Sequence, residues 1–160
     1  MVSAPVIREY RPSDFDTLWK IDQECFEPRI SYTRRELAFY VRRKRGFTLV
    51  AEARDKIVGF IVLDRNRHGQ GHVITIDVVS EARRSGLGSR LLSSAEERLR
   101  SLQCASVFLE TAVDNAAALG FYKRHGYTLV EKIPQYYLGR VDAMVLAKDL
   151  FTTDSRRGSP

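Results

Sequence analysis

The chain has 160 residues, 44% of them hydrophobic and 29% charged, and a formal net charge of +6. This length suits one domain, and the composition is that of an ordinary globular protein rather than a disordered chain. No apolar run reaches the roughly 20 residues that a membrane helix needs, and the N-terminus lacks a signal-peptide pattern. We therefore expect a cytoplasmic protein with no membrane partner.

The positive charge and the two cysteines narrow the range of partners further. The charge fits an anionic partner, but the sequence has no alternating basic and aromatic stripe, so we expect no nucleic-acid partner. Cys25 and Cys104 lie far apart in apolar contexts, without a C-x-x-C or histidine spacing. We interpret them as free thiols in a reducing compartment, and we predict no metal site.

The first part of the chain carries the signals of two helices and three strands. Apolar residues follow helical spacing after Ser13 and Asp14, either of which can cap a helix. Thr33 can cap a second helix, with Glu36 at the capping-box position and Gly46 as its end. Runs of β-branched and aromatic residues predict strands; these span Val6–Arg11, Phe47–Ala53 and Ile57–Leu63.

The stretch that follows combines a strand, a glycine-containing turn and a helix. The β-branched run His72–Val79 predicts a buried strand, the turn Arg83–Gly88 comes next, and leucines then recur at helical spacing. A helix start presents unpaired N–H groups to an anion, and Gly86 and Gly88 allow a phosphate to approach the backbone. We interpret this turn, with its two arginines, as a pyrophosphate-binding loop. The alternative is a tight turn with solvated arginines.

A strand over Ser106–Thr111 completes a strand–helix–strand unit. Such units place their two strands parallel, so the strands from His72 and Ser106 should lie side by side, with their carboxyl ends splayed around a ligand. Asp114 or Asn115 can cap the next helix. The remaining expected elements are that helix, Ala116–Arg124, and a strand pair, Tyr127–Lys132 and Ala143–Leu150. The composition after Phe151 predicts a disordered tail.

Two motifs connect this pattern to a known family. R-x-x-G-x-G spans Arg83 to Gly88 after a strand that ends in V-x-S-E-A, and E-x4-N-x6-Y spans Glu110, Asn115 and Tyr122. The sequence resembles the GNAT superfamily of N-acetyltransferases, and within it the RimI type, which acetylates the N-terminal residue of a ribosomal protein. Ser80, where the family often has proline, and the segment around Tyr32 depart from that pattern.

The resemblance implies an α/β (α+β) fold with a single GNAT-like domain over residues 1–150 and a tail over residues 151–160. It implies a mixed central sheet of about six to seven strands, splayed between two parallel strands and flanked by about four helices. It implies acetyl-CoA as the cofactor. The residues that would hold acetyl-CoA are the backbone of Ile76, Asp77 and Val78, the loop residues Arg83, Arg84, Ser85, Gly86, Leu87, Gly88 and Ser89, and Asn115.

The resemblance also assigns the catalytic roles to Glu110 and Tyr122. An ammonium cannot attack a thioester, so a base must remove a proton, and Glu110 would do so directly or through water. Tyr122 would protonate the departing thiolate. The alternatives are a solvated strand-end carboxylate for Glu110 and a core aromatic for Tyr122. His72 is a reserve base, and a backbone N–H near Val79 could polarise the thioester carbonyl.

The acceptor is the least determined part of this interpretation. Candidate substrate contacts are Phe26, Ile30, Tyr32, Asp77, Tyr136 and Tyr137. Asp77 could attract the substrate amine or be a structural carboxylate, and the tyrosine pair could clamp a substrate backbone or pack in a turn. We expect an acetyltransferase that acts on a protein N-terminal α-amine, as a monomer or homodimer. The open alternatives are a small amine or lysine side chain as acceptor, and a non-catalytic acyl-CoA sensor.

Overall fold

The structure is a computed structural model that describes residues 4–26, 31–137 and 141–151. In these residues, seven strands form one mixed sheet in the order β1-β2-β3-β4-β5-β7-β6. The strands are β1 Val6–Glu9, β2 Phe47–Ala53, β3 Lys56–Arg65, β4 Gln70–Val78, β5 Ser106–Ala112, β6 Thr128–Tyr137 and β7 Val141–Asp149. The α-helices are α1 Phe15–Cys25, α2 Arg34–Val41, α3 Leu87–Ser101 and α4 Ala116–Arg124, and 3-10 turns span Pro12–Asp14 and Ser80–Ala82.

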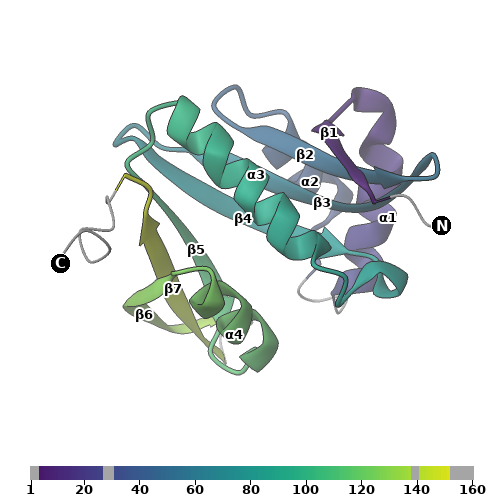
Figure 1. Ribbon diagram of the computed structural model, residues 1–160. Helices are drawn as coiled ribbons and strands as arrows, with labels where there is room; N and C mark the ends of the chain where they lie inside the picture. The colour runs from purple at the N-terminus through teal and green to yellow at the C-terminus, as the bar shows by residue number, and fades with distance from the viewer. Residues whose placement is uncertain (1–3, 27–30, 138–140, 152–160) are drawn as a thin grey trace, which may run out of the picture.

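Helices cover both faces of the sheet. α3 crosses one face and α4 packs on the same side, whereas α1 and α2 lie behind the sheet (Figure 1). The face that α3 presents to the sheet consists of residues at helical spacing, all of them buried: Leu87, Leu91, Leu92, Ala95 and Leu99. Because β3 is covered on both faces, its middle is a continuous buried run rather than an alternating one. The expected mixed sheet with four helices is confirmed.

The helix ends agree with the predicted capping in two cases and differ in two. Thr33 and Glu36 form the predicted capping box, and Asn115 rather than Asp114 caps α4. Asp14 does not cap α1 through its side chain, because its carboxylate is held by Arg8, with Oδ2 2.8 Å from Nη1. α2 ends at Val41, so the predicted extension to Gly46 was wrong.

The sheet divides where β4 and β5 part. These two strands pair in parallel only from Gln70 to His72, opposite Ser106 to Phe108. A bulge at Ile74 follows, because Val73 and Thr75 face consecutive residues of β3. A bulge bends a strand and increases its twist, so β4 turns away while β5 continues along β7. The predicted splaying of the two carboxyl ends is confirmed (Figure 1).

On the face that α3 covers, a buried acid joins the two halves of the divided sheet. Glu96 of α3 is only 4% exposed, and it accepts hydrogen bonds from the Tyr127 hydroxyl at 2.8 Å and from the Lys148 ammonium at 2.9 Å. Tyr127 follows α4 and Lys148 belongs to β7, so this acid ties α3 to the other half of the sheet. No helix in the described ranges has the length and apolar character needed to cross a membrane.

Candidate active site

The free edge of β4 is the first part of the site. The Val79 N–H donates to the Val58 carbonyl of β3 at 3.0 Å. Backbone groups alternate along a strand, so Asp77 also faces β3, and Ile76 and Val78 face the edge that β5 has left. The Asp77 backbone therefore faces β3 rather than the ligand, and the backbone N–H predicted near Val79 would be that of Val78. The geometry leaves the Ile76 backbone and the Val78 N–H for that role.

The turn before α3 has the geometry of an anion-binding loop. Gly86 is the N-cap of α3 and has φ +82°, and Arg84 also has a positive φ of 61°. A left-handed residue directly before a helix directs successive backbone N–H groups to one side, which forms an anion-binding nest. An added Cβ at Gly86 would meet no atom within 4 Å, so the space in front of the loop is open. These features fit a pyrophosphate group.

The other residues predicted for this loop differ in which of their groups can reach an anion. Arg84 and Ser85 are exposed, whereas the Leu87 side chain is buried in the core, so only its N–H can face an anion. The Arg83 side chain points away from the loop: its Nε donates to the Val78 carbonyl at 3.0 Å and its Nη2 contacts Cys25 Sγ at 3.5 Å. The sequence pattern shows two adjacent arginines, but it contains no signal of this difference between them.

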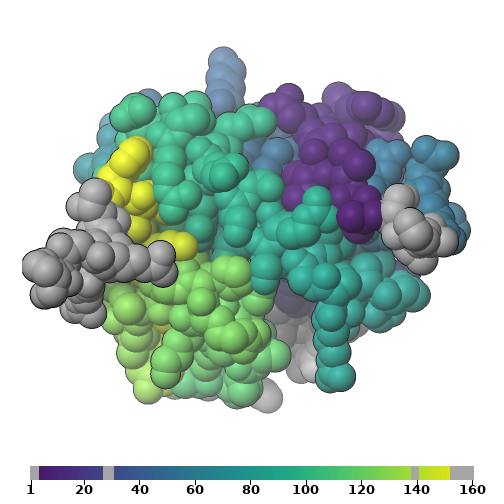
Figure 2. All heavy atoms as spheres, in the orientation of Figure 1, coloured from purple at the N-terminus to yellow at the C-terminus, as the bar shows by residue number. Residues whose placement is uncertain are grey.

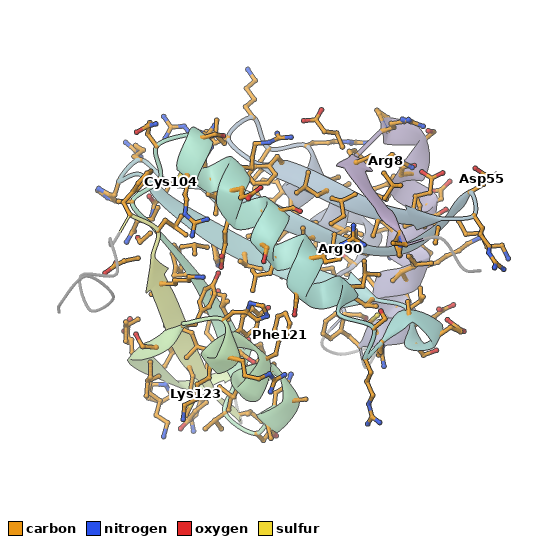
Figure 3. The ribbon with its side chains drawn as sticks, in the orientation of Figure 1. Arg8, Asp55, Arg90, Cys104, Phe121 and Lys123 are labelled. Atoms are coloured by element: carbon orange, nitrogen blue, oxygen red, sulfur yellow. The ribbon has the colours of Figure 1, made fainter. Side chains whose placement is uncertain are left out.

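α4 closes over the beginning of α3. Phe121 points from α4 toward α3 (Figure 3), and its ring lies 3.5 Å from the position of a Cβ at Gly88. Ser89 Oγ and His125 Nε2 are 2.9 Å apart, and burial lowers the pKa of His125. His125 has no motif around it that predicts this contact. In the space-filling view, a notch separates the atoms of α4 from those before α3 (Figure 2).

The side-chain amide oxygen of Asn115 has a structural role. Its Oδ1 accepts the Ala118 N–H at 3.1 Å, which caps α4. The amide NH2 group is left to donate to a ligand. The predicted contact with the cofactor arm is therefore compatible with the cap, and it stays a prediction.

Replacing Gly86 by valine is expected to weaken CoA binding by about 10–100-fold, since hydrogen bonds to charged groups contribute about 1.5–3 kcal/mol each. The added side chain would occupy the open space before the nest and strain a left-handed residue. Gly69→Val is the matched control, because Gly69 also has a positive φ, of 71°, but lies in the β3–β4 turn. Calorimetry should show unchanged CoA affinity for Gly69→Val. Equal affinities for both variants would exclude this loop as the phosphate site.

A histidine–carboxylate pair lies at the point where β4 and β5 part. His72 Nε2 is 2.7 Å from Glu110 Oε2, and the imidazole stacks on the Phe108 ring with centroids 4.3 Å apart. Both side chains of the pair are partly exposed, by 26% and 21%. His72, which the sequence leaves as a reserve base, is therefore in direct contact with the predicted base.

Tyr122 lies nearly buried on α4, 7% exposed. Its ring makes edge contacts with Phe121 and Tyr127, at centroid distances of 5.1 and 5.4 Å. Burial raises the pKa of Tyr122, and the nearby Asp77 and Tyr137 add to the effect. The phenol therefore retains its proton at neutral pH. It can serve as a proton donor that faces both β4 and β6.

Tyr136 and Tyr137 lie near Glu110. Burial raises the pKa of Tyr137 to about 12, with contributions from Tyr136 and Glu110. Burial also raises the pKa of Tyr136, and here Glu110 and Tyr40 of α2 contribute. Tyr32 stacks edge-on against Tyr40 at 5.6 Å and donates its hydroxyl to the Ile74 carbonyl at 3.2 Å. The predicted contacts Tyr32, Tyr136 and Tyr137 therefore come together.

The other predicted substrate contacts are Asp77, Phe26 and Ile30. The Asp77 side chain is 1% exposed and accepts from Thr75 Oγ1 at 2.6 Å, so it lies inside the protein and not in the groove. Phe26 is half-buried just after α1, and Ile30 lies outside the described residues. Between residues 4 and 151, leaving out 27–30 and 138–140, no three His, Cys, Asp or Glu side chains form a possible metal site.

A splayed sheet, a turn with the geometry to bind an anion and a histidine–carboxylate pair at the fork fit an acyl-CoA-dependent transferase, and comparisons with known proteins agree. Residues 15–127 match the acetyltransferase (GNAT) family. The chain is 33% identical to an uncharacterised N-acetyltransferase of Methanocaldococcus jannaschii over 89% of this chain and 90% of that protein. It is 28% identical to N-alpha-acetyltransferase 30 of Schizosaccharomyces pombe, over 77% and 83%.

A solved structure shares the whole fold. The ribosomal-protein-S18-alanine N-acetyltransferase of Escherichia coli superposes with a TM-score of 0.85 at 22% identity, over 93% of this chain and 96% of that one. The chain belongs to the GNAT acetyltransferase family. It is an acetyl-CoA-dependent N-acetyltransferase.

Proposed function

We propose that the protein transfers the acetyl group of acetyl-CoA to the α-amino group of a protein N-terminus. The observation that carries this proposal is the His72–Glu110 contact of 2.7 Å at the fork of the sheet, beside Tyr136 and Tyr137. The name of the Schizosaccharomyces pombe relative supports the same acceptor class. A cytoplasmic location and a monomeric or homodimeric state stay predictions.

The acetyl-CoA side of the site uses backbone groups. The N–H groups of the turn from Arg84 to Ser89 would hold the pyrophosphate, because they lie at a helix start with an open approach at Gly86. The free edge of β4 would pair with the extended cofactor arm through Ile76 and Val78. The Val78 N–H is also the donor that can polarise the thioester carbonyl.

The proton transfers use side chains from the two halves of the sheet. Glu110, in contact with His72, would take the proton from the acceptor ammonium, which makes the amine a nucleophile. The nitrogen would then attack the thioester carbon, the carbon–sulfur bond would break, and the thiolate would accept a proton from Tyr122. The nitrogen would lose its second proton to solvent, and Tyr122 would regain its proton from solvent. Burial keeps Tyr122 protonated, so it is ready to donate.

The tyrosines suit a peptide acceptor. Tyr136 and Tyr137 place phenol groups near Glu110, and Tyr32 and Tyr40 lie near this tyrosine pair. Phenol hydroxyls can both donate to and accept from the first peptide groups of an extended chain. An α-amine carries such groups directly beside the reacting nitrogen, whereas a lysine amine is separated from them by four methylenes.

The test compares two peptides that differ only in which amine is free. One peptide has a free N-terminus and no lysine, and the other has the same sequence with an acetylated N-terminus and one lysine. We expect release of CoA thiol with the first peptide and little with the second. Faster turnover of the lysine peptide or of a polyamine would contradict the α-amine assignment. Tight CoA binding with no turnover of any amine would indicate that the protein is a non-catalytic acyl-CoA sensor.

A further inference from the structure

Two carboxyl groups meet inside the protein, beside the acceptor side of the site. Asp22 of α1 is 0% exposed and Asp77 of β4 is 1% exposed, and the Asp22 carboxyl lies close enough to Asp77 to raise its pKa. Burial is the main cause that raises the pKa of Asp77 well above its usual value, and the contact with Asp22 adds to it. Two ionised carboxylates in contact at a buried position would repel strongly.

The hydrogen bonds account for two of the four carboxyl oxygens. Asp77 Oδ1 accepts from the Thr75 hydroxyl at 2.6 Å, and Asp22 Oδ2 accepts from the Tyr32 N–H at 2.9 Å. The other two oxygens, Asp22 Oδ1 and Asp77 Oδ2, are buried and have no hydrogen-bond partner among the described residues. A single proton between these two oxygens satisfies both of them.

We propose that Asp22 and Asp77 share one proton, and that this shared proton positions Tyr32 beside the acceptor. The proton joins α1 to β4, and the Tyr32 N–H extends the connection to the segment that precedes α2. Tyr32 is held at two further points, through its hydroxyl on Ile74 and through its carbonyl, which accepts from Gln23. The positioning role rests on the acceptor site proposed above, whereas the shared proton does not.

The charged and titratable groups around Asp77 come from several elements. α1 contributes Asp22 and Cys25, the segment after β4 contributes Arg83, and α4 contributes Tyr122. β3 places Phe60, which does not titrate, opposite Asp77. Arg83 is the cation in this set, and its effect on the pKa of Asp77 is smaller than that of burial and of Asp22. Rising pH should therefore remove the shared proton and weaken the link.

Asparagine substitutions test the shared proton directly. In Asp77→Asn the side-chain oxygen can still accept from Thr75, and the NH2 group donates permanently to Asp22. In Asp22→Asn the oxygen still accepts from Tyr32, and the NH2 group donates to Asp77. Each single variant should therefore preserve the link. In the double variant two NH2 groups face each other without an acceptor, so the link should break.

The first measurement is melting temperature between about pH 5 and about pH 9. The pKa of Asp77 is higher in the folded than in the unfolded chain, so its proton stabilises the fold at low pH and this stabilisation is lost as pH rises. The wild type should therefore lose stability relative to Asp77→Asn with increasing pH. If the melting temperatures of the wild type and Asp77→Asn change in parallel with pH, or if the double variant is as stable as the single variants, the proposal of a shared proton is wrong.

The second measurement is the KM of the acceptor peptide over the same range. It should rise with pH in the wild type and stay flat in Asp77→Asn, and in the double variant it should be raised by about tenfold at neutral pH. Asp14→Asn is the control, because Asp14 is a buried carboxylate paired with Arg8. That variant should lose stability without a change in acceptor KM. An unchanged acceptor KM in the double variant would overturn the positioning role of the shared proton. If the wild type transfers no acetyl group to the peptide, the proposed function is wrong, but the shared proton is still tested by the melting temperatures.

Discussion

Glu110→Gln is expected to lower kcat by about 10²–10⁴-fold, the range typical of a lost general base. The amide keeps the shape of the carboxylate and its contact with His72, but it cannot take a proton from the acceptor ammonium. CoA should still bind, because the phosphate loop lies on the other half of the sheet. Steady-state kinetics with the free N-terminal peptide, together with calorimetry for CoA, will measure the two effects separately.

Two further variants define how the base works. His72→Gln and the double variant should each be about as slow as Glu110→Gln, because residues that act as one unit give strongly non-additive losses. Glu97→Gln, an exposed position on α3, is the matched control and should have normal kcat. If Glu110→Gln were as active as the wild type, the base would be His72 alone or water.

Tyr122→Phe is expected to lower kcat by about 10²–10⁴-fold, because the departing thiolate loses its acid. The ring contacts with Phe121 and Tyr127 need no hydroxyl, so the melting temperature should change little. The loss should shrink with an activated aryl thioester as the acetyl donor, since that thiolate departs without a proton. Comparing kcat for acetyl-CoA and for the aryl thioester is the decisive measurement.

Tyr127→Phe provides the matched control for this prediction. Tyr127 is also buried, but its hydroxyl donates to the buried Glu96 at 2.8 Å. Removing that hydroxyl leaves an acceptor unsatisfied, which should cost about 1–3 kcal/mol of stability. Tyr127→Phe should therefore melt earlier and retain its kcat. If Tyr122→Phe is equally slow with both donors, or if it melts as early as Tyr127→Phe, then Tyr122 is a packing residue.

Local signals in the sequence predicted the parts of the fold that depend on neighbouring residues. The Thr33 capping box and the glycine-containing turn before α3 are examples, because each is determined by groups within about one helical turn. The parallel neighbours β4 and β5 were also predictable, since a strand–helix–strand connection allows few arrangements. The motif with Glu110 and Tyr122 led directly to the family.

The sequence by itself thus determined the family and the candidates for phosphate loop, base and acid, whereas the tertiary structure decided which side chains meet. Strict alternation along β4 would place His72 and Asp77 on opposite faces, but the bulge at Ile74 puts both on the side of α1 and α2. The register of His72 opposite Phe108 brings Glu110 to the imidazole. These contacts join residues far apart in the chain, and their register depends on packing over the whole sheet, which no short sequence pattern encodes.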